Sequence, residues 1–245
     1  GADVVKVETP QGDTLRGQGA GSEAVSFYFA AHNRNKRSIV LDLRKDDGRR
    51  VLERLIAGAD VLVENFRPGA MARLGFDYDA VARLNPRIVY LSISGYGQTG
   101  PYADGRVYDA VIQAVSGFSA AHRDHSTGEP SLLATAVCDK LTALTASQAI
   151  VTALFARERD GKGRRIEVSM LDSALAFQWP DAMYNHVFVD RPEPPYPEFG
   201  ATQKPWKTRD GFVATMAPQP DEFRVEAERR GAGRQAEDAG RLAAQ

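Results

Sequence analysis

The sequence predicts an α/β domain with a doubly wound, Rossmann-like parallel sheet, because apolar strands and helical patterns alternate along the chain. Four short runs are nearly continuous in apolar residues, as expected for parallel strands covered on both faces. They lie at residues 2–8, 38–43, 61–64 and 88–93. A further strand is predicted at residues 165–169, after the longest helical pattern.

Amphipathic patterns separate and follow these strands. Helices are predicted at residues 46–57, 78–84, 108–115, 141–158 and 171–186. The helix at 78–84 is stopped by Asn85-Pro86. The strongest pattern is 141–158, where apolar residues form a wide face, namely Ala143, Leu144, Ile150, Val151, Leu154 and Phe155.

Four prolines crowd into residues 190–197 and mark the predicted domain boundary. Residues 1–189 are expected to form the large domain. Residues 190–245 are expected to be a linker and the start of a smaller α+β domain, with a strand within 211–217 and a helix at 221–230.

The composition excludes several classes of protein. The 31 lysines and arginines are balanced by 32 acids, giving a net charge of −1 and no support for nucleic-acid binding. The apolar runs are too short to cross a bilayer, and no leader precedes Gly1. A lone Cys138 fits a reducing interior, so we expect a cytoplasmic protein. The four histidines do not show metal-ligand spacing, so no metal site is expected.

Cations and glycines follow the predicted strands, where ligands bind in open α/β sheets. Phosphate groups bind at such positions through cationic side chains and free backbone N–H groups. Arg44, Arg67, Arg73 and Arg106 are candidates, and residues 95–105 form a glycine-rich loop after the fourth strand. Each arginine taken singly is better explained as a solvated surface residue, and it is their grouping at the carboxyl ends of strands that favours a ligand site.

Asp139 directly precedes the helix predicted at 141–158. A carboxylate there can cap the helix, which stabilises a fold by about 0.5–2 kcal/mol. The same position also suits a nucleophile, because a helix N-terminus favours an ionised carboxylate and can steady an oxyanion. The neighbouring Cys138 has no histidine nearby in the sequence, and we interpret it as a packed hydrophobic residue.

Five motifs in order resemble the family III CoA-transferases, which include formyl-CoA transferase, the carnitine CoA-transferases and α-methylacyl-CoA racemase. The motifs are GADVVKVE at 1–8, NKRSIVLDL at 35–43, VENFRPG at 63–69, SISGYGQTGPY at 92–102 and GKGRRIEVSMLD at 161–172. Together they cover most of residues 1–175.

The resemblance implies an acyl-CoA:carboxylate CoA-transferase in which Asp139 is the catalytic nucleophile. Coenzyme A would be a substrate, with no permanently bound cofactor, and the partners would be an acyl-CoA, a carboxylic acid acceptor and a second copy in an interlocked homodimer. The positions that match the family's CoA-binding segments are Leu41, Asp42, Leu43, Arg44, Asn65, Phe66, Arg67, Arg73, Arg106, Val107, Tyr108 and Asp109. The resemblance also implies a first βα unit before residue 1 in relatives, and we expect the large domain described by this sequence to be without it.

Three alternatives stay open. A racemase of the same family would use a histidine before Asp109, but Tyr108 stands there, and an unperturbed phenol (pKa about 10) is a poor base. An inactive CoA-binding fragment is the second. A nucleotide-binding module without chemistry, or an NAD-dependent dehydrogenase, is the third, and the lack of Gly-x-Gly-x-x-Gly after the first strand argues against dinucleotide binding.

Overall fold

The computed structural model describes every residue except 20–24, 125–126, 191–204, 208 and 215–245. The chain divides into two units. The first comprises Gly1–Arg123 and Pro130–Phe177, and the second comprises Asp124–Glu129 and Gln178–Gln245. All candidate site residues lie in the first unit. The boundary predicted at 190–197 and the helix predicted at 221–230 lie outside or largely outside the described residues and stay predictions.

The first two strands form a small parallel sheet. β1 (Val4–Glu8) pairs with β2 (Lys36–Val40) in a register that sets Val4 opposite Lys36. A 3-10 helix, η1 (Thr14–Gly17), and α1 (Phe27–Asn33) connect the two strands. The second strand was predicted to run from 38 to 43, but β2 ends at Val40, so the candidate segment Leu41–Arg44 follows the strand rather than belonging to it.

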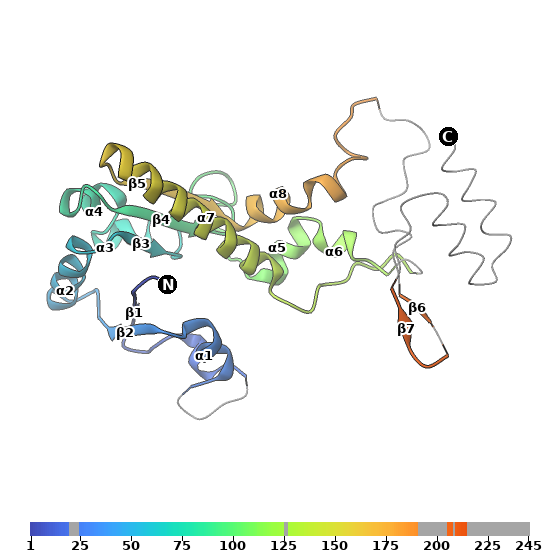
Figure 1. Ribbon diagram of the computed structural model, residues 1–245, viewed down its shortest axis with the longest axis horizontal. Coiled ribbons are helices and arrows are strands. Elements are labelled where there is room, and N and C mark those ends of the chain that lie inside the picture. Colours follow the sequence, from blue (N-terminus) through green and yellow to red (C-terminus); the bar gives the residue numbers. More distant parts are fainter. Residues whose placement is uncertain (20–24, 125–126, 191–204, 208, 215–245) are drawn as a thin grey trace. The chain divides into compact units, whose positions relative to one another are not determined.

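Three further parallel strands form a second sheet in the order β3-β4-β5 (Figure 1). They are β3 (Val61–Glu64), β4 (Val89–Ser94) and β5 (Arg164–Ser169). The central strand is buried on both faces, which explains its continuous apolar sequence. The α/β fold with parallel strands is confirmed, although the described strands of the first unit are hydrogen-bonded as two sheets.

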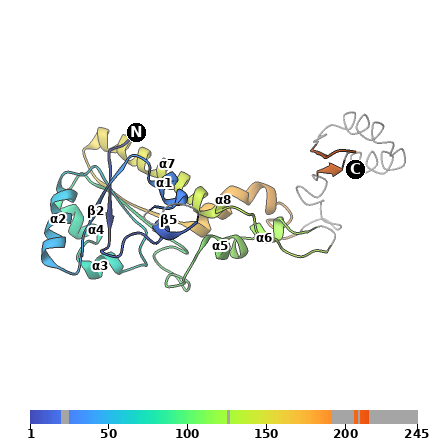
Figure 2. The same cartoon turned by 90° about the horizontal axis from the view of Figure 1, so that it is seen from below.

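Successive residues of β4 point into different cores, as the two-residue period of a strand requires. Tyr90 packs in a cluster with Leu52 and Ile56 of α2 (Asp46–Ala57). Two short helices, α3 (Ala70–Leu74) and α4 (Tyr78–Leu84), complete that cluster and lie beside α2 (Figure 2). Leu91, the next residue, packs instead with Ala146 of α7 (Val137–Asp160).

Three more helices, the last of which continues into the second unit, follow the sheet strands. α5 (Asp109–Val115) and α6 (Phe118–Ala121) come after β4, and α8 (Met170–Ala182) comes directly after β5. In the second unit, β6 (Trp206–Lys207) and β7 (Phe212–Val213) form an antiparallel pair. No helix in the described part of the chain is long and apolar enough to cross a membrane.

The longest helix departs from prediction in its start and in its buried face. α7 begins at Val137, four residues before the predicted start. Three residues of the predicted apolar face, Leu144, Val151 and Phe155, are 60–63% exposed. The helix buries a narrower stripe of mostly small side chains, namely Cys138, Thr142, Ala146, Ala153 and Arg157. Small residues on that stripe let the helix lie close to β4 and β5, which it contacts.

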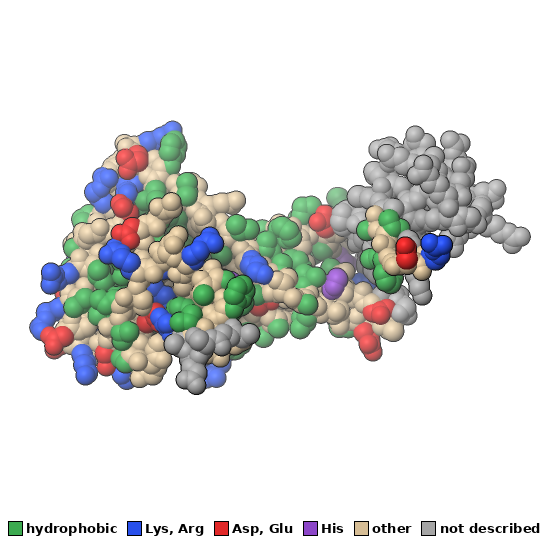
Figure 3. Space-filling model, turned by 60° about the horizontal axis from the view of Figure 1, so that its bottom comes forward, with side chains coloured by type: hydrophobic (Ala, Val, Ile, Leu, Met, Phe, Trp, Pro, Cys, Tyr) green, Lys and Arg blue, Asp and Glu red, His purple; other side chains and the backbone are tan. Residues whose placement is uncertain are grey.

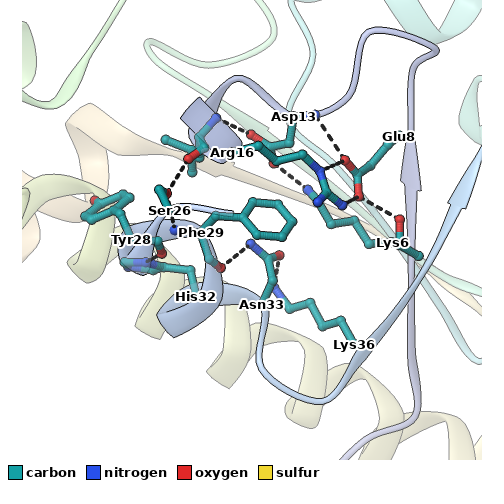
Figure 4. A network of polar contacts seen from close by, with 12 residues as sticks. Lys6, Glu8, Asp13, Arg16, Ser26, Tyr28, Phe29, His32, Asn33 and Lys36 are labelled. Carbon is teal, nitrogen blue, oxygen red and sulfur yellow. Dashed lines mark hydrogen bonds and ion pairs between the residues drawn. The ribbon is translucent and has the colours of Figure 1, made fainter. Parts of the chain in front are cut away.

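A buried carboxylate ties β1 to the connection that follows it (Figure 4). Glu8 is almost fully buried and accepts two hydrogen bonds from the Arg16 guanidinium, each 2.8 Å long. Ser38 of β2 donates a third at 2.6 Å, and the Asp13 backbone N–H donates a fourth at 3.0 Å. The bonds from Arg16, aided by Ser38 and Asp13, outweigh burial and lower the pKa of Glu8 to about 2. The carboxylate therefore stabilises the β1–β2 pair.

We expect Glu8→Gln to lower the free energy of unfolding by about 2 kcal/mol at pH 7, because a charged, fully bonded acceptor is lost. The native pKa is depressed, so this stabilisation is complete above about pH 4.5 and is lost as the pH falls toward about 2. The difference in the free energy of unfolding between the wild type and Glu8→Gln, measured in urea, should become smaller as the pH falls over that range. The control Glu158→Gln removes an exposed carboxylate with ion pairs no shorter than 3.9 Å and should change stability by less than about 0.5 kcal/mol. A loss of unfolding free energy in Glu8→Gln that does not change with pH would contradict this account.

Candidate active site

Asp139 lies inside the first turn of α7, not before the helix as predicted. The helix begins earlier because its first turn is fixed from two sides. Cys138 packs into a core with Ile112 and Phe118. The Asp139 backbone N–H donates to the Asp109 carboxylate at 3.0 Å, so the first turn is capped by a side chain of another helix. The cap interpretation of Asp139 is therefore wrong.

The Asp139 side chain is free for chemistry. Residue Ala136 occupies the N-cap position without a side-chain bond, and Asp139 is exposed. Within the described ranges, no hydrogen bond or ion pair reaches the Asp139 carboxylate. A nucleophile needs this combination of solvent access and uncommitted oxygens.

Two effects make the ionised form of Asp139 less favourable than in water. The residue as a whole is exposed, but its carboxyl group is flanked by protein, and this partial burial raises the pKa of Asp139. The negative charge of Asp109 raises it further, while Lys140 acts in the opposite direction. The helix N-terminus also favours the ionised form, but the net direction is upward. The raised pKa makes the ionised carboxylate a stronger nucleophile.

Cys138 is not a competing nucleophile. It is fully buried, and burial, followed by the charges of Asp109 and Asp139, raises the pKa of its thiol to about 11. The thiol is therefore protonated near neutral pH and does not reach solvent. The interpretation of Cys138 as a packed hydrophobic residue is confirmed.

The segment Leu41–Arg44 makes a tight turn against α2. Leu41 is buried and continues the sheet pairing, since its N–H donates to Glu8 O at 2.9 Å. The Asp42 carboxylate accepts from the Arg44 backbone N–H and guanidinium at 2.8–3.2 Å, and these bonds lower the pKa of Asp42. A Cβ on Gly48 would lie 2.2 Å from Asp42 O, so only glycine lets the first turn of α2 approach this turn.

Exposed cations follow β3. Asn65, Phe66 and Arg67 come directly after the strand and are all exposed, and the Phe66 N–H donates to Glu64 Oε2 at 2.9 Å. Arg73 is exposed on α3, with its guanidinium over Gly69. Together with the exposed Arg106, Arg67 and Arg73 form no ion pair with any acid of the described residues, whereas Arg44 is paired with Asp42. Three arginines thus remain available for an anionic ligand.

The glycine-rich loop folds back onto the end of β4. A Cβ on Gly95 would lie 2.4 Å from the Val107 side chain, so the two ends of the loop are in close contact. Tyr108, 80% exposed, then occupies the N-cap of α5, and Asp109 is the first residue of that helix. The contact between Gly95 and Val107 therefore brings Asp109 to the carboxyl edge of the sheet, where it reaches Asp139.

Basic and acidic side chains are interspersed over the first unit on the face shown in Figure 3. The predicted residues of Arg106–Asp109 and Asp139 are joined through Asp109. Among the described residues, no hydrogen bond or ion pair joins Leu41–Arg44 or Asn65–Arg67 to Asp139. Sequence reasoning missed Gln113, a buried polar residue of α5 that bonds to Asp109. Its position in the apolar pattern of residues 108–115 was the available signal.

Comparison with known proteins decides the family. The family model described as CoA-transferase family III matches residues 1–244. The chain belongs to CoA-transferase family III.

Several members of the family are similar to this chain. An acetyl-CoA:oxalate CoA-transferase of Acetobacter aceti is 45% identical over 179 residues, which cover 72% of this chain and 46% of that relative. A succinate–glutarate CoA-transferase of Agrobacterium fabrum is 37% identical over 235 residues, which cover 91% and 58%. The chain thus spans about half the length of these curated relatives. The crystal structure of a CaiB/BaiF family protein from Brucella suis matches 97% of this chain and 64% of that one, with a TM-score of 0.81 and 34% identity.

We expect Gly48→Ala to lower both stability and affinity for CoA, because the added methyl group would collide with the Asp42 carbonyl and displace the turn at Leu41–Arg44. The free energy of unfolding should fall by about 1–3 kcal/mol. Gly58→Ala is the matched control, since its Cβ meets nothing closer than 4.0 Å and its φ is −104°. Urea unfolding and calorimetric titration with CoA measure the two effects. Equal free energies of unfolding and equal CoA affinities for Gly48→Ala and Gly58→Ala would contradict the close approach of Gly48 to the Asp42 carbonyl.

We expect Asp139→Ala to be as stable as the wild type or more stable at pH 7. The native pKa of Asp139 is raised, so its ionised form opposes folding above that pKa, and the penalty disappears as the pH falls toward about 3.8. Asp77 caps α4 by accepting from Ala80 N–H at 2.8 Å. Asp77→Ala should therefore lower the free energy of unfolding by about 0.5–2 kcal/mol in the same urea unfolding experiment. A comparable loss for Asp139→Ala would mean that Asp139 is a structural cap.

Proposed function

We propose that the protein is a CoA-transferase that moves coenzyme A from an acyl-CoA to a carboxylic acid, with Asp139 as the nucleophile. The observation that carries the proposal is the uncommitted carboxylate of Asp139 on the first turn of α7. The family and the names of the curated relatives support the same reaction class. The acid groups of those relatives, oxalate, succinate and glutarate, point to small dicarboxylates as the donor or acceptor acids.

The reaction proceeds through two anhydrides and one thioester. The Asp139 carboxylate attacks the thioester carbonyl of the acyl-CoA, the C–S bond breaks, and CoA leaves as the thiolate. The thiolate attacks the Asp139 carbonyl of the mixed anhydride, which releases the donor acid and forms an aspartyl-CoA thioester. The acceptor carboxylate displaces the thiolate to form a second anhydride. Attack of the thiolate on the acceptor carbonyl then yields the new acyl-CoA and restores Asp139.

The positive end of the α7 helix dipole supplies electrostatic support for these steps. Each attack places negative charge on a carbonyl oxygen, and the positive end of a helix favours such charge. A helix terminus therefore suits this chemistry better than a fully hydrated loop.

The CoA phosphates are assigned to the cations at the carboxyl edges of the strands. Arg67, Arg73 and Arg106 are exposed and unpaired among the described residues, and arginine binds phosphate in a bidentate manner. Leu41–Arg44, Asn65–Arg67 and Arg106–Asp109 follow β2, β3 and β4, which is where ligands bind in open α/β sheets. The cytoplasmic location and the homodimer remain predictions from composition and from the family resemblance.

Racemisation is the second reaction class of the family. It would use a base at the position of Tyr108, next to Asp109. The Tyr108 phenol is 80% exposed, and no hydrogen bond from the described residues reaches its hydroxyl, so transfer remains the proposal. Exchange of the α-proton of an acyl-CoA for deuterium, in the absence of an acceptor acid, would instead identify a racemase.

We expect Asp139→Ala to lower kcat by at least about 10³-fold, because the covalent route is lost, while the dissociation constant of CoA changes little. Incubation of the wild type with an acyl-CoA and hydroxylamine should leave a hydroxamate on the peptide that contains Asp139, detected by mass spectrometry. The control Asp79→Ala removes an exposed acid from the first turn of another helix and should retain full activity. Transfer by Asp139→Ala at the wild-type rate would refute the proposal.

A further inference from the structure

Gln113 is a buried amide whose hydrogen bonds fix the segment that leads into α7. The residue is 2% exposed. Its Oε1 accepts from the Leu133 N–H at 2.8 Å, and one of its two Nε2 protons is shared between the carbonyl oxygens of Thr135 at 3.1 Å and Leu133 at 3.4 Å. Because these partners comprise one N–H donor and two carbonyl acceptors, they determine the orientation of the amide. Gln113 therefore holds residues 133–135 against α5.

The same amide also orients Asp109. Nε2 of Gln113 donates to Asp109 Oδ2 at 2.6 Å, a short bond to a half-buried carboxylate one turn earlier on α5. The other oxygen of that carboxylate, Oδ1, accepts from the Asp139 N–H at 3.0 Å. One buried side chain thus controls both the segment before α7 and the group that caps its first turn.

As a nucleophile, Asp139 would depend on where its carboxylate oxygens lie. Its carboxylate has no hydrogen-bond partner among the described residues, so only the backbone of the first turn determines where its oxygens lie. Helix ends fray when their first N–H groups are unpaired. A displacement of about 1 Å at a reacting group costs on the order of 10²-fold in rate.

We propose that Gln113 is a positioning residue for the nucleophile, acting on Asp139 through Asp109 and through residues 133–135. This inference rests on the proposed function, since it assigns a role toward the Asp139 nucleophile. It adds a residue that does not touch the substrate and that sets the geometry of the reacting carboxylate.

Gln113→Met is the first test, with the intact protein, because methionine keeps the volume of glutamine and removes its amide. We expect kcat to fall by about 10- to 100-fold, the rate of Asp139 adduct formation to fall in parallel, and KM for the acyl-CoA to stay within about twofold. An unchanged kcat would overturn the inference, as would a rise in KM alone.

Asn85 provides a closely matched control. Its Nδ2 donates to the carbonyls of Ile56 and Ala59 at 2.9 and 2.8 Å, and its Oδ1 accepts from Arg87 N–H at 3.1 Å. This amide makes the same kinds of bonds as Gln113 but lies next to the amino end of β4. Asn85→Leu should lower the unfolding midpoint in urea about as much as Gln113→Met and leave kcat within about threefold. If both variants lose kcat equally, the effect is general destabilisation and the inference fails.

An exchange of donor and acceptor tests the contact to Asp109 even if Gln113→Met folds poorly. Gln113→Glu sets two carboxylates against each other, and Asp109→Asn sets two amide donors against each other. In the double variant, the Asn amide can donate to the Glu carboxylate while its oxygen still accepts from the Asp139 N–H. We expect the double variant to exceed Gln113→Glu in kcat by about fivefold or more, because both variants lose the donation to the Thr135 carbonyl and only the double variant regains the contact to residue 109. A double variant no faster than Gln113→Glu would overturn the inference.

Failure of the proposed function has a different signature. In that case the wild-type protein itself would form no adduct on Asp139 during transfer. The positioning role fails instead when the wild type forms the adduct and the Gln113 variants form it at the wild-type rate.

Discussion

The hydrogen bond from the Asp139 N–H to the Asp109 carboxylate joins α5 to α7 and determines what the candidate nucleophile can do. A helix that begins with an acidic residue commonly uses that residue as its own cap, and the carboxylate is then occupied. Here the capping carboxylate comes from 30 positions earlier in the chain. Asp139 is left uncommitted, and partial burial, followed by the like charge of Asp109, raises its pKa.

The surroundings of this bond depend on close approaches of backbone. Gly95 lets Val107 pack against the end of β4, and this contact places the start of α5 at the carboxyl edge of the sheet. Gly48 does the same for α2 and the turn at Leu41–Arg44. Both are positions where any side chain would collide, so the shape of the edge is set by glycine and the chemistry by the residues that follow each strand.

The regular parts of the fold were predictable from the sequence where stop signals are strong. The bounds of α2, α4 and β3 match the predicted ranges, because charged first turns and Asn85-Pro86 delimit them. The start of α7 was missed because its cap is Asp109, a contact that no local pattern reveals. Leu144 and Phe155 were placed on a buried face, yet apolar residues occur on all sides of that helix and periodicity cannot select among them. The assignment of Asp139 and the CoA segments came from the family resemblance, and Gln113 was found only from the structure.

Oxygen-18 transfer from the acceptor to Asp139 tests the central claim most directly. In the proposed sequence the acceptor carboxylate forms an anhydride with Asp139, and the thiolate then attacks the acceptor carbonyl. One acceptor oxygen must therefore remain on Asp139. After turnover with a doubly oxygen-18-labelled acceptor acid, the peptide that contains Asp139 should gain one oxygen-18 atom. Many turnovers with no label on Asp139 would contradict covalent catalysis by this residue.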